Sequence, residues 1–196
     1  MDAPVTPSRE RFIDAALVVM STRGIAASTT KLIAAQAGLS EALLYKHFAD
    51  KQQLFLAVLE ERLPRPRFDP NASRGDDLAG GLTALVEQLM AFFAASFPIS
   101  ASIFGTPELL AQHREGIAAH GHGPHEPVSV VIAYLDAERE TGRVRTDADT
   151  ASVARVLVGA AFHQGFLAAF SGADAVPNAR AVAKGIAAAV LPALTH

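Results

Sequence analysis

A glycine interrupts a helical pattern in the stretch LIAAQAGLSEALLYKHFADK, which runs from Leu32 to Lys51. Small and branched apolar residues at helical spacing precede Gly38, and a second short apolar run follows Ser40. Glycine adopts the positive φ that ends one helix, and serine is a favoured N-cap for the next. The chain is therefore constrained to form two short helices joined by a tight turn at this place.

The second of these helices has two chemically different sides. Leu39, Leu44 and Phe48 can anchor it from behind. Its outer side offers groups suited to base edges and phosphates, namely Ser40, Glu41, Ala42, Leu43, Tyr45, Lys46 and His47. Lys51 begins the following helix, where its ammonium and the helix N-terminus together favour an anion. These features indicate a DNA-reading helix-turn-helix, although the turn alone fits a helical hairpin inside an ordinary bundle equally well.

The whole chain is predicted to be all-α. Half of its residues are hydrophobic and 19% are charged, which is typical of a globular protein. Alanine and leucine dominate, and strand-forming residues do not recur at a period of two. About nine helices are expected, at approximately 8–23, 30–37, 41–47, 51–62, 76–97, 107–119, 127–142, 150–170 and 177–194.

The stretch LPRPRFDPNASRGDD, residues 63–77, is the clearest linker, because it holds three prolines and few large apolar residues. We therefore predict two domains. Residues 6–66 form a helix-turn-helix domain with its motif at about 29–48, and residues 67–196 form a second helical domain.

The segment from Arg11 to Leu63 resembles the DNA-binding domain of the TetR family of bacterial transcriptional regulators. The resemblance rests on elements in the right order and spacing: Gly24, Thr29, Ile33-Ala34, Ala37-Gly38, Tyr45, Phe48 and Lys51. It implies a three-helix N-terminal domain and a variable helical domain that binds a small-molecule effector and forms a homodimer. Repression is the family's usual mode, so release from a palindromic DNA operator by an inducer is the expected function.

The resemblance also implies roles for individual residues. Thr29, Lys31, Tyr45, His47 and Lys51 would contact backbone phosphates. A second group would face the bases, comprising Ser40, Glu41, Ala42 and Leu43. The apolar pair Ala42-Leu43 departs from the commonest pattern, and it favours contact with thymine methyl groups. Glu41 suits a cytosine amino group or merely repels phosphate. The alternative function is a helical protein-binding module without DNA activity.

Aromatic residues recur in the second domain at helical spacing. Core packing explains most of them, but some can line a mostly apolar pocket with a few polar groups. The candidate ligand-binding residues are Phe93, Phe97, Phe104, His113, Tyr134, Phe162, His163 and Phe166. We expect an apolar or aromatic effector.

The helices at about 150–170 and 177–194 are the predicted homodimer interface. The first is apolar nearly all round, so both of its sides need partners. Small residues along it would allow close helix approach: Ala154, Gly159, Ala160, Ala161 and Gly165. The last helix carries Val182, Ile186, Ala189, Val190 and Leu194. The alternative is that both helices simply cover the core of a monomer.

Several other classes of protein are disfavoured. The common nucleophile, phosphate-loop and metalloprotease motifs are absent, so we expect no enzyme and no cofactor. Histidines at 113, 120, 122 and 125 leave a zinc or nickel site open, but solvated loop histidines fit the glycine- and proline-rich HGHGPHEP better, and no metal is expected.

The cellular setting is expected to be the cytoplasm. The chain has no cysteine and begins without the layout of a signal peptide. Arg155, His163 and Gln164 interrupt its longest apolar run, which argues against a membrane span. The net charge of −3 neither supports nor excludes DNA, because seven basic and seven acidic residues balance through Leu63.

Overall fold

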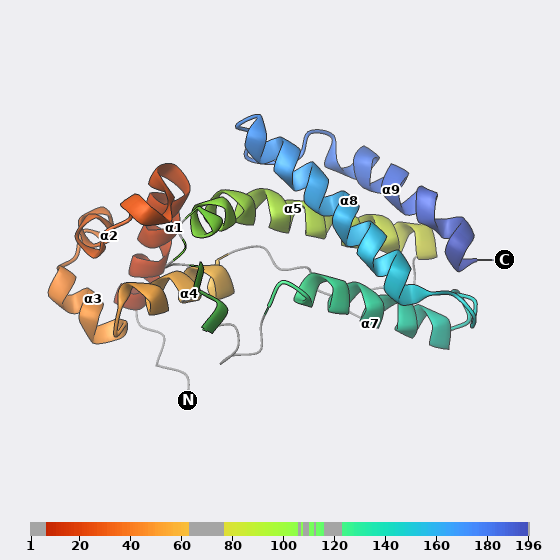
Figure 1. Cartoon of the computed structure of the whole chain (residues 1–196), viewed down its shortest axis with the longest axis horizontal. Helices are drawn as coiled ribbons and strands as arrows, with labels where there is room; N and C mark the ends of the chain where they lie inside the picture. The colour runs from red at the N-terminus through yellow and green to blue at the C-terminus, as the bar shows by residue number, and fades with distance from the viewer. Residues whose placement is uncertain are drawn as a thin grey trace. The chain divides into compact units, whose positions relative to one another are not determined.

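The computed structural model describes residues 7–62, 77–105, 107, 110–111, 113–115 and 123–195. Every regular element within these ranges is a helix, which confirms the all-α prediction. Figure 1 labels these helices along the chain. All but the last residue of the linker expected at 63–77 and much of the helix expected at 107–119 lie outside the described residues.

Contacts divide the chain into two compact units. The first unit comprises Met1–Leu63 and Pro98–Arg114, and the second comprises Pro64–Phe97 and Glu115–His196. The expected boundary near residue 66 remains a prediction. The sequence pattern does not indicate that residues 98–114 belong to the first unit.

Four helices build the N-terminal part of the first unit: α1 (Pro7–Ala27), α2 (Thr30–Ala37), α3 (Glu41–His47) and α4 (Lys51–Glu61). Their inward sides carry fully buried apolar residues, among them Phe12, Ile13, Met20, Ile33, Leu44 and Leu54. Gly24, the expected stop of the first helix, has non-helical torsions (φ 73°, ψ 163°), and one further turn follows it to Ala27. The helix thus changes direction at the glycine that the sequence marks.

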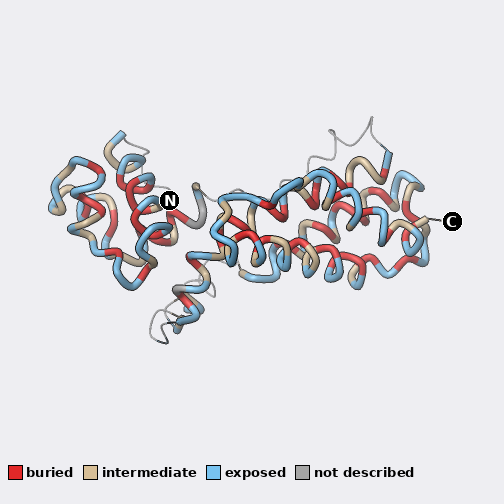
Figure 2. The backbone as a smooth tube through the Cα atoms, turned by 90° about the horizontal axis from the view of Figure 1, so that it is seen from above, coloured by how far each residue is buried: buried red, intermediate tan, exposed pale blue. Residues whose placement is uncertain are grey.

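The second unit packs the first part of α5 (Leu78–Phe104) with α7 (Glu126–Glu140), α8 (Thr150–Phe170) and α9 (Ala179–Leu194). Buried residues lie along the sides where these helices meet (Figure 2). α5 and α8 approach closely at Gly165, where an added Cβ would lie 2.6 Å from the Cβ of Phe93 and 2.8 Å from the backbone nitrogen of Ala94. A glycine therefore sets the distance between these helices.

A backbone bond ties the end of α9 to the loop before α8. The amide nitrogen of Arg145 donates to the carbonyl oxygen of Leu194 at 2.9 Å. The side chain of Leu194 is fully buried. The last turn of α9 is therefore an integral part of the second unit.

Pro98 does not end a helix, which corrects the sequence-based expectation. α5 continues through it to Phe104. A proline inside a helix removes one hydrogen bond and crowds the preceding turn, at a cost of about 3 kcal/mol. Ile99 and Ile103, both buried, follow it at helical spacing, and burying them offsets this cost.

In the part of the chain that the structure describes, two helical stretches are long and apolar enough to cross a membrane by length and composition alone, Leu78–Ala101 and Thr150–Phe170. In the most apolar 18-residue stretch of each helix, half of the residues of the first and a third of the residues of the second are buried inside the protein. Core helices of helical bundles pass the same test, so this is weak evidence for a span. Much of α8 is therefore not covered by the rest of the chain.

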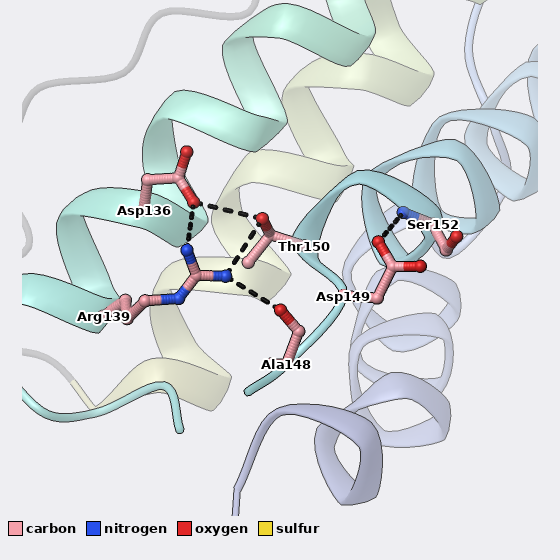
Figure 3. Close-up of polar contacts among 6 residues, drawn as sticks. All are labelled: Asp136, Arg139, Ala148, Asp149, Thr150 and Ser152. Carbon is pink, nitrogen blue, oxygen red and sulfur yellow. Dashed lines mark hydrogen bonds and ion pairs between the residues drawn. The ribbon is translucent and has the colours of Figure 1, made fainter. Parts of the chain in front are cut away.

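A polar cluster fixes the junction between α7 and α8 (Figure 3). Arg139 donates from Nη1 to Asp136 Oδ1 at 3.1 Å and from Nη2 to the carbonyl oxygen of Ala148 at 2.8 Å. Thr150 accepts from Arg139 Nη2 at 3.2 Å and donates to Asp136 Oδ1 at 3.0 Å. Asp149, one of two aspartates before α8 that could cap it by sequence, accepts from the backbone nitrogen of Ser152 at 3.0 Å. Hydrogen bonds with the side chain and the backbone of Ser152 lower the pKa of the Asp149 carboxyl.

Replacing Thr150 with valine should destabilise the second unit by about 1–2 kcal/mol, because the buried hydroxyl loses two hydrogen bonds while the shape is kept. Chemical denaturation followed by circular dichroism measures this. Thr146→Val is the matched control, since it makes the same chemical change at an exposed threonine in the loop before α8. Equal stability of the two variants would show that the Thr150 bonds contribute nothing.

Candidate nucleic-acid interface

The helix-turn-helix is built from local capping interactions. Thr29 caps α2 by accepting from the backbone nitrogen of Leu32 at 3.2 Å, and Ser40 caps α3 by accepting from Leu43 at 3.2 Å. Gly38 ends α2 in the left-handed conformation (φ 64°, ψ 34°). Asp50 caps α4 through the backbone nitrogen of Gln53 at 2.8 Å. The cap at Ser40 and the turn at Gly38 are as the sequence analysis predicts.

Arg11 braces the turn from α1, a role that the sequence analysis missed. Its Nη2 donates to the carbonyl oxygen of Ala37 at 2.6 Å. A Cβ placed on Gly38 would lie 3.3 Å from the same nitrogen. The bond satisfies a carbonyl at the end of α2, and no local signal could reveal it because the partners are 26 residues apart.

The inner side of α3 is anchored as expected. Leu44 and Phe48 are buried, whereas Leu39 and Leu43 are half-buried. The guanidinium of Arg9 lies 5.5 Å from the ring centre of Phe48 and also bonds both carboxylate oxygens of Glu61, at 2.7 and 2.9 Å. This pairing lowers the pKa of the Glu61 carboxyl. α3 is thereby held against a framework formed by α1 and α4.

Several predicted contact residues are exposed on the outer side. Tyr45 is 51% exposed. The other exposed candidates are Thr29, Lys31, Ser40, Ala42 and Lys46. Lys31 and Lys46 place two cationic groups beside the helix expected to enter the major groove. This surface can bind phosphate electrostatically.

Glu41 is tied to a residue that the sequence analysis did not select. Thr30 Oγ1 donates to Glu41 Oε1 at 2.5 Å, and the same hydroxyl lies 3.3 Å from the hydroxyl of Tyr45. Thr30 begins α2, Glu41 begins α3, and Tyr45 lies one turn further along α3. The three side chains therefore form a link between the two helices of the motif.

Two predicted phosphate contacts are engaged within the domain. His47 Nε2 lies 2.8 Å from Ser8 Oγ, and its ring centre is 6.1 Å from that of Phe12. Lys51 Nζ donates to the carbonyl oxygen of Ile25 at 3.2 Å and lies 5.0 Å from the ring centre of Phe55. Partial burial lowers the pKa of Lys51. Both residues join α1 to the end of the motif.

Four candidate ligand-binding residues come together in the second unit. Phe162 lies 5.3 Å from Phe93 and 5.8 Å from Phe97, and Phe166 lies 5.3 Å from Phe97, measured between ring centres. Phe92 and Phe170 extend this series at 5.1 Å and 5.9 Å from their neighbours. We call these six residues the phenylalanine ladder. It joins α5 to α8.

The other ligand candidates lie elsewhere. Tyr134 is buried on α7 against Gly81, where an added Cβ would lie 2.1 Å from its hydroxyl. Gly81 and Phe93 are separated by about 18 Å along α5. His163 is exposed on α8. Phe104, which is 70% exposed, and His113 belong to the first unit, and burial lowers the pKa of His113.

The histidine-rich segment falls largely outside the described residues, which exclude His120 and His122. His125 is exposed immediately before α7. Among the residues that the structure describes, no group of three or more histidine or acidic side chains is close enough to hold a metal ion.

Exposed apolar side chains are concentrated on α8. Four of the seven exposed large hydrophobic residues in the described part of the chain lie on this helix: Val156, Phe162, Leu167 and Phe170. α9 buries Val190 and Leu194 in its own unit and exposes small residues, including Ala181, Gly185, Ala188 and Ala189. Val190 and Leu194 therefore face the core, contrary to their expected place at a subunit contact.

Comparison with known proteins finds a similarity to one protein family in the N-terminal part of the chain. The family model for bacterial regulatory proteins, tetR family, matches residues 12–58. The chain is 35% identical over 86 residues to the uncharacterized HTH-type transcriptional regulator YvkB of Bacillus subtilis, covering 42% of this chain and 46% of that protein. It is 33% identical over 100 residues to the HTH-type transcriptional repressor KstR2 of Mycolicibacterium smegmatis, covering 48% and 46%. The chain spans about half the length of the curated relatives it matches.

A solved structure shares its fold with nearly the whole of this chain. The fatty acid degradation regulator FadR from Bacillus halodurans superposes with a TM-score of 0.71 at 18% identity, covering 96% of this chain and 97% of that one. This identity establishes likeness of fold alone. The matched family and both curated relatives are described as regulators, which agrees with the expectation that the chain is not an enzyme.

Proposed function

We propose that this chain, whose residues 12–58 match the family model for bacterial regulatory proteins, tetR family, is a ligand-responsive transcriptional repressor. It binds a palindromic DNA operator as a homodimer in the cytoplasm and is released by a small apolar or aromatic inducer. The observation that carries this proposal is the braced turn at Gly38, which supports a short helix with an exposed polar side.

In this proposal the exposed lysines supply most of the affinity for DNA. Lys31 and Lys46 neutralise phosphates and release counterions, so binding weakens as salt increases. Ala42 and Leu43 meet base edges, and their apolar side chains suit thymine methyl groups. His47 and Lys51 act mainly by holding the motif together, since both already have partners within the domain.

Replacing Lys46 with alanine should weaken DNA binding about equally on all sequences and reduce the slope of log affinity against log salt by about 1. The measurement is fluorescence anisotropy with a labelled duplex from immediately upstream of the gene, against a scrambled duplex. Arg155→Ala is the matched control, because Arg155 is an exposed cation on α8 in the second unit. An unchanged slope for the Lys46 variant would contradict its role, and equal weak binding of wild-type protein to both duplexes would favour a protein-binding module.

The inducer is proposed to bind beside the phenylalanine ladder. Phe93, Phe97, Phe162 and Phe166 provide aromatic faces contributed by two helices. A ligand that separates or reorders these rings would alter the packing of α5 on α8. It releases DNA only if it binds one arrangement more tightly than the other.

The homodimer is proposed to form through α8 and α9. Val156, Ala160, His163, Leu167 and Phe170 recur at intervals of three or four residues and form one stripe on α8. Most of this stripe is exposed in the single chain. A two-fold contact would cover it and present two recognition helices to successive major grooves, about 34–36 Å apart.

The double substitution Val156→Asp, Leu167→Asp should convert the dimer to a monomer, because two charges would be buried without partners at the contact. Analytical ultracentrifugation across protein concentrations measures this. Val18→Asp serves as control, since Val18 is an exposed apolar residue on α1. A wild-type protein that stays monomeric at micromolar concentration would exclude the proposed dimer.

A further inference from the structure

Proton counting assigns a direction to the contacts among Thr30, Glu41 and Tyr45. An ionised carboxylate only accepts hydrogen bonds, so Thr30 donates to Glu41 Oε1 at 2.5 Å. A threonine hydroxyl has a single proton. In the contact of 3.3 Å between Thr30 and Tyr45, the tyrosine must therefore be the donor. This second bond is weak, because hydroxyl bonds usually measure about 2.5–3.0 Å.

With the hydroxyls oriented in this way, the cluster has no further hydrogen-bond donor for a bound molecule. The proton of Tyr45 points to Thr30, and that of Thr30 points to Glu41. The remaining capacity consists of acceptors, namely the second carboxylate oxygen of Glu41 and the lone pairs of Tyr45. Phosphate oxygens are acceptors as well, so the cluster is poorly matched to the DNA backbone and well matched to a donor.

The donors that a recognition helix meets in the major groove are amino groups of bases. Cytosine presents its N4 amino group, whereas adenine presents an amino group beside the N7 acceptor, which would repel a carboxylate. Glu41 occupies the first turn of α3, and residues at the N-terminal end of such helices contact base edges. The donor and acceptor pattern of the major groove therefore favours cytosine over the other bases at Glu41.

We infer that Glu41 is a specificity-determining residue that selects a cytosine in the operator, and that Thr30 and Tyr45 are positioning residues that hold its carboxylate. Tyr45 then has no direct role in phosphate binding, in contrast to the role that the family resemblance implies. This inference rests on the proposed DNA-binding function. The exposed Lys31 and Lys46 then contact the phosphates, because the anionic carboxylate of Glu41 cannot do so.

The test is selection of bound duplexes from a randomised pool, with the full-length wild-type protein and four variants. Wild-type protein should enrich sites in which one position in each half-site prefers cytosine by about tenfold or more. Glu41→Gln should lose that preference at this position alone. Thr30→Val should weaken it, and Thr30→Ser, which keeps the hydroxyl, should restore it. Circular dichroism checks that each variant is folded.

Tyr45→Phe supplies the second readout. Loss of the tyrosine proton should reduce the preference for cytosine while affinity for duplexes lacking that cytosine stays unchanged. An equal loss of affinity on all duplexes would indicate a phosphate contact and overturn the assignment for Tyr45. An unchanged base preference in Glu41→Gln would overturn the inference and leave the proposed function standing. Failure of wild-type protein to enrich any sequence would reject both.

Discussion

Replacing Gly165 with alanine should destabilise the second unit by about 2–3 kcal/mol, although alanine is the better helix former. The added methyl would lie 2.6 Å from the Cβ of Phe93 and 2.8 Å from the backbone nitrogen of Ala94. Neither atom is the free end of a flexible side chain. α5 and α8 would have to separate, and the phenylalanine contacts between them would be lost.

Gly159→Ala is the matched control on the same helix. Nothing lies within 4 Å of a Cβ added at Gly159, so this substitution should stabilise the helix by about 0.5–1 kcal/mol. Chemical denaturation followed by circular dichroism measures both changes. Repeating it at several protein concentrations separates packing inside one chain from subunit association. Stabilisation by both substitutions would show that α5 and α8 have room to adjust at Gly165.

Replacing Gly38 with valine should disable the helix-turn-helix. A β-branched residue in the left-handed region costs at least about 1–2 kcal/mol. Its Cβ would also lie 3.3 Å from Arg11 Nη2, the group that holds the carbonyl of Ala37. Since α3 follows directly, we expect affinity for DNA to fall by about tenfold or more and thermal stability to decrease.

Gly38→Asn separates backbone strain from other effects, because asparagine adopts the left-handed conformation more readily than other residues with side chains. It should retain most of the stability and most of the DNA affinity. Differential scanning calorimetry and anisotropy titration give the two quantities. Wild-type behaviour of the valine variant in both measurements would show that the turn tolerates another backbone conformation.

Local chemistry made much of the first unit predictable. Thr29, Ser40 and Asp50 each cap the helix that immediately follows, and Gly38 adopts the left-handed conformation that its place after a helical run predicts. Such features depend on residues within one turn of each other. Asp149 caps α8 in the same way.

Interactions between distant residues were beyond the reach of sequence patterns. The bond from Thr30 to Glu41 spans 11 residues, and that from Arg11 to Ala37 spans 26. Pro98 marks a helix end by local rules, but buried isoleucines after it favour continuation. Tyr134 suits a polar position in a pocket by its chemistry, whereas packing places it against Gly81. Each of these outcomes depends on which helices meet in space.

The bond between Arg145 and Leu194 has a practical consequence for handling the protein. A truncation that removes Leu194 would remove both a buried side chain and the acceptor for the loop before α8. Stepwise shortening should therefore loosen the second unit abruptly at that residue instead of gradually. The last turn of α9 should be kept in any shortened version.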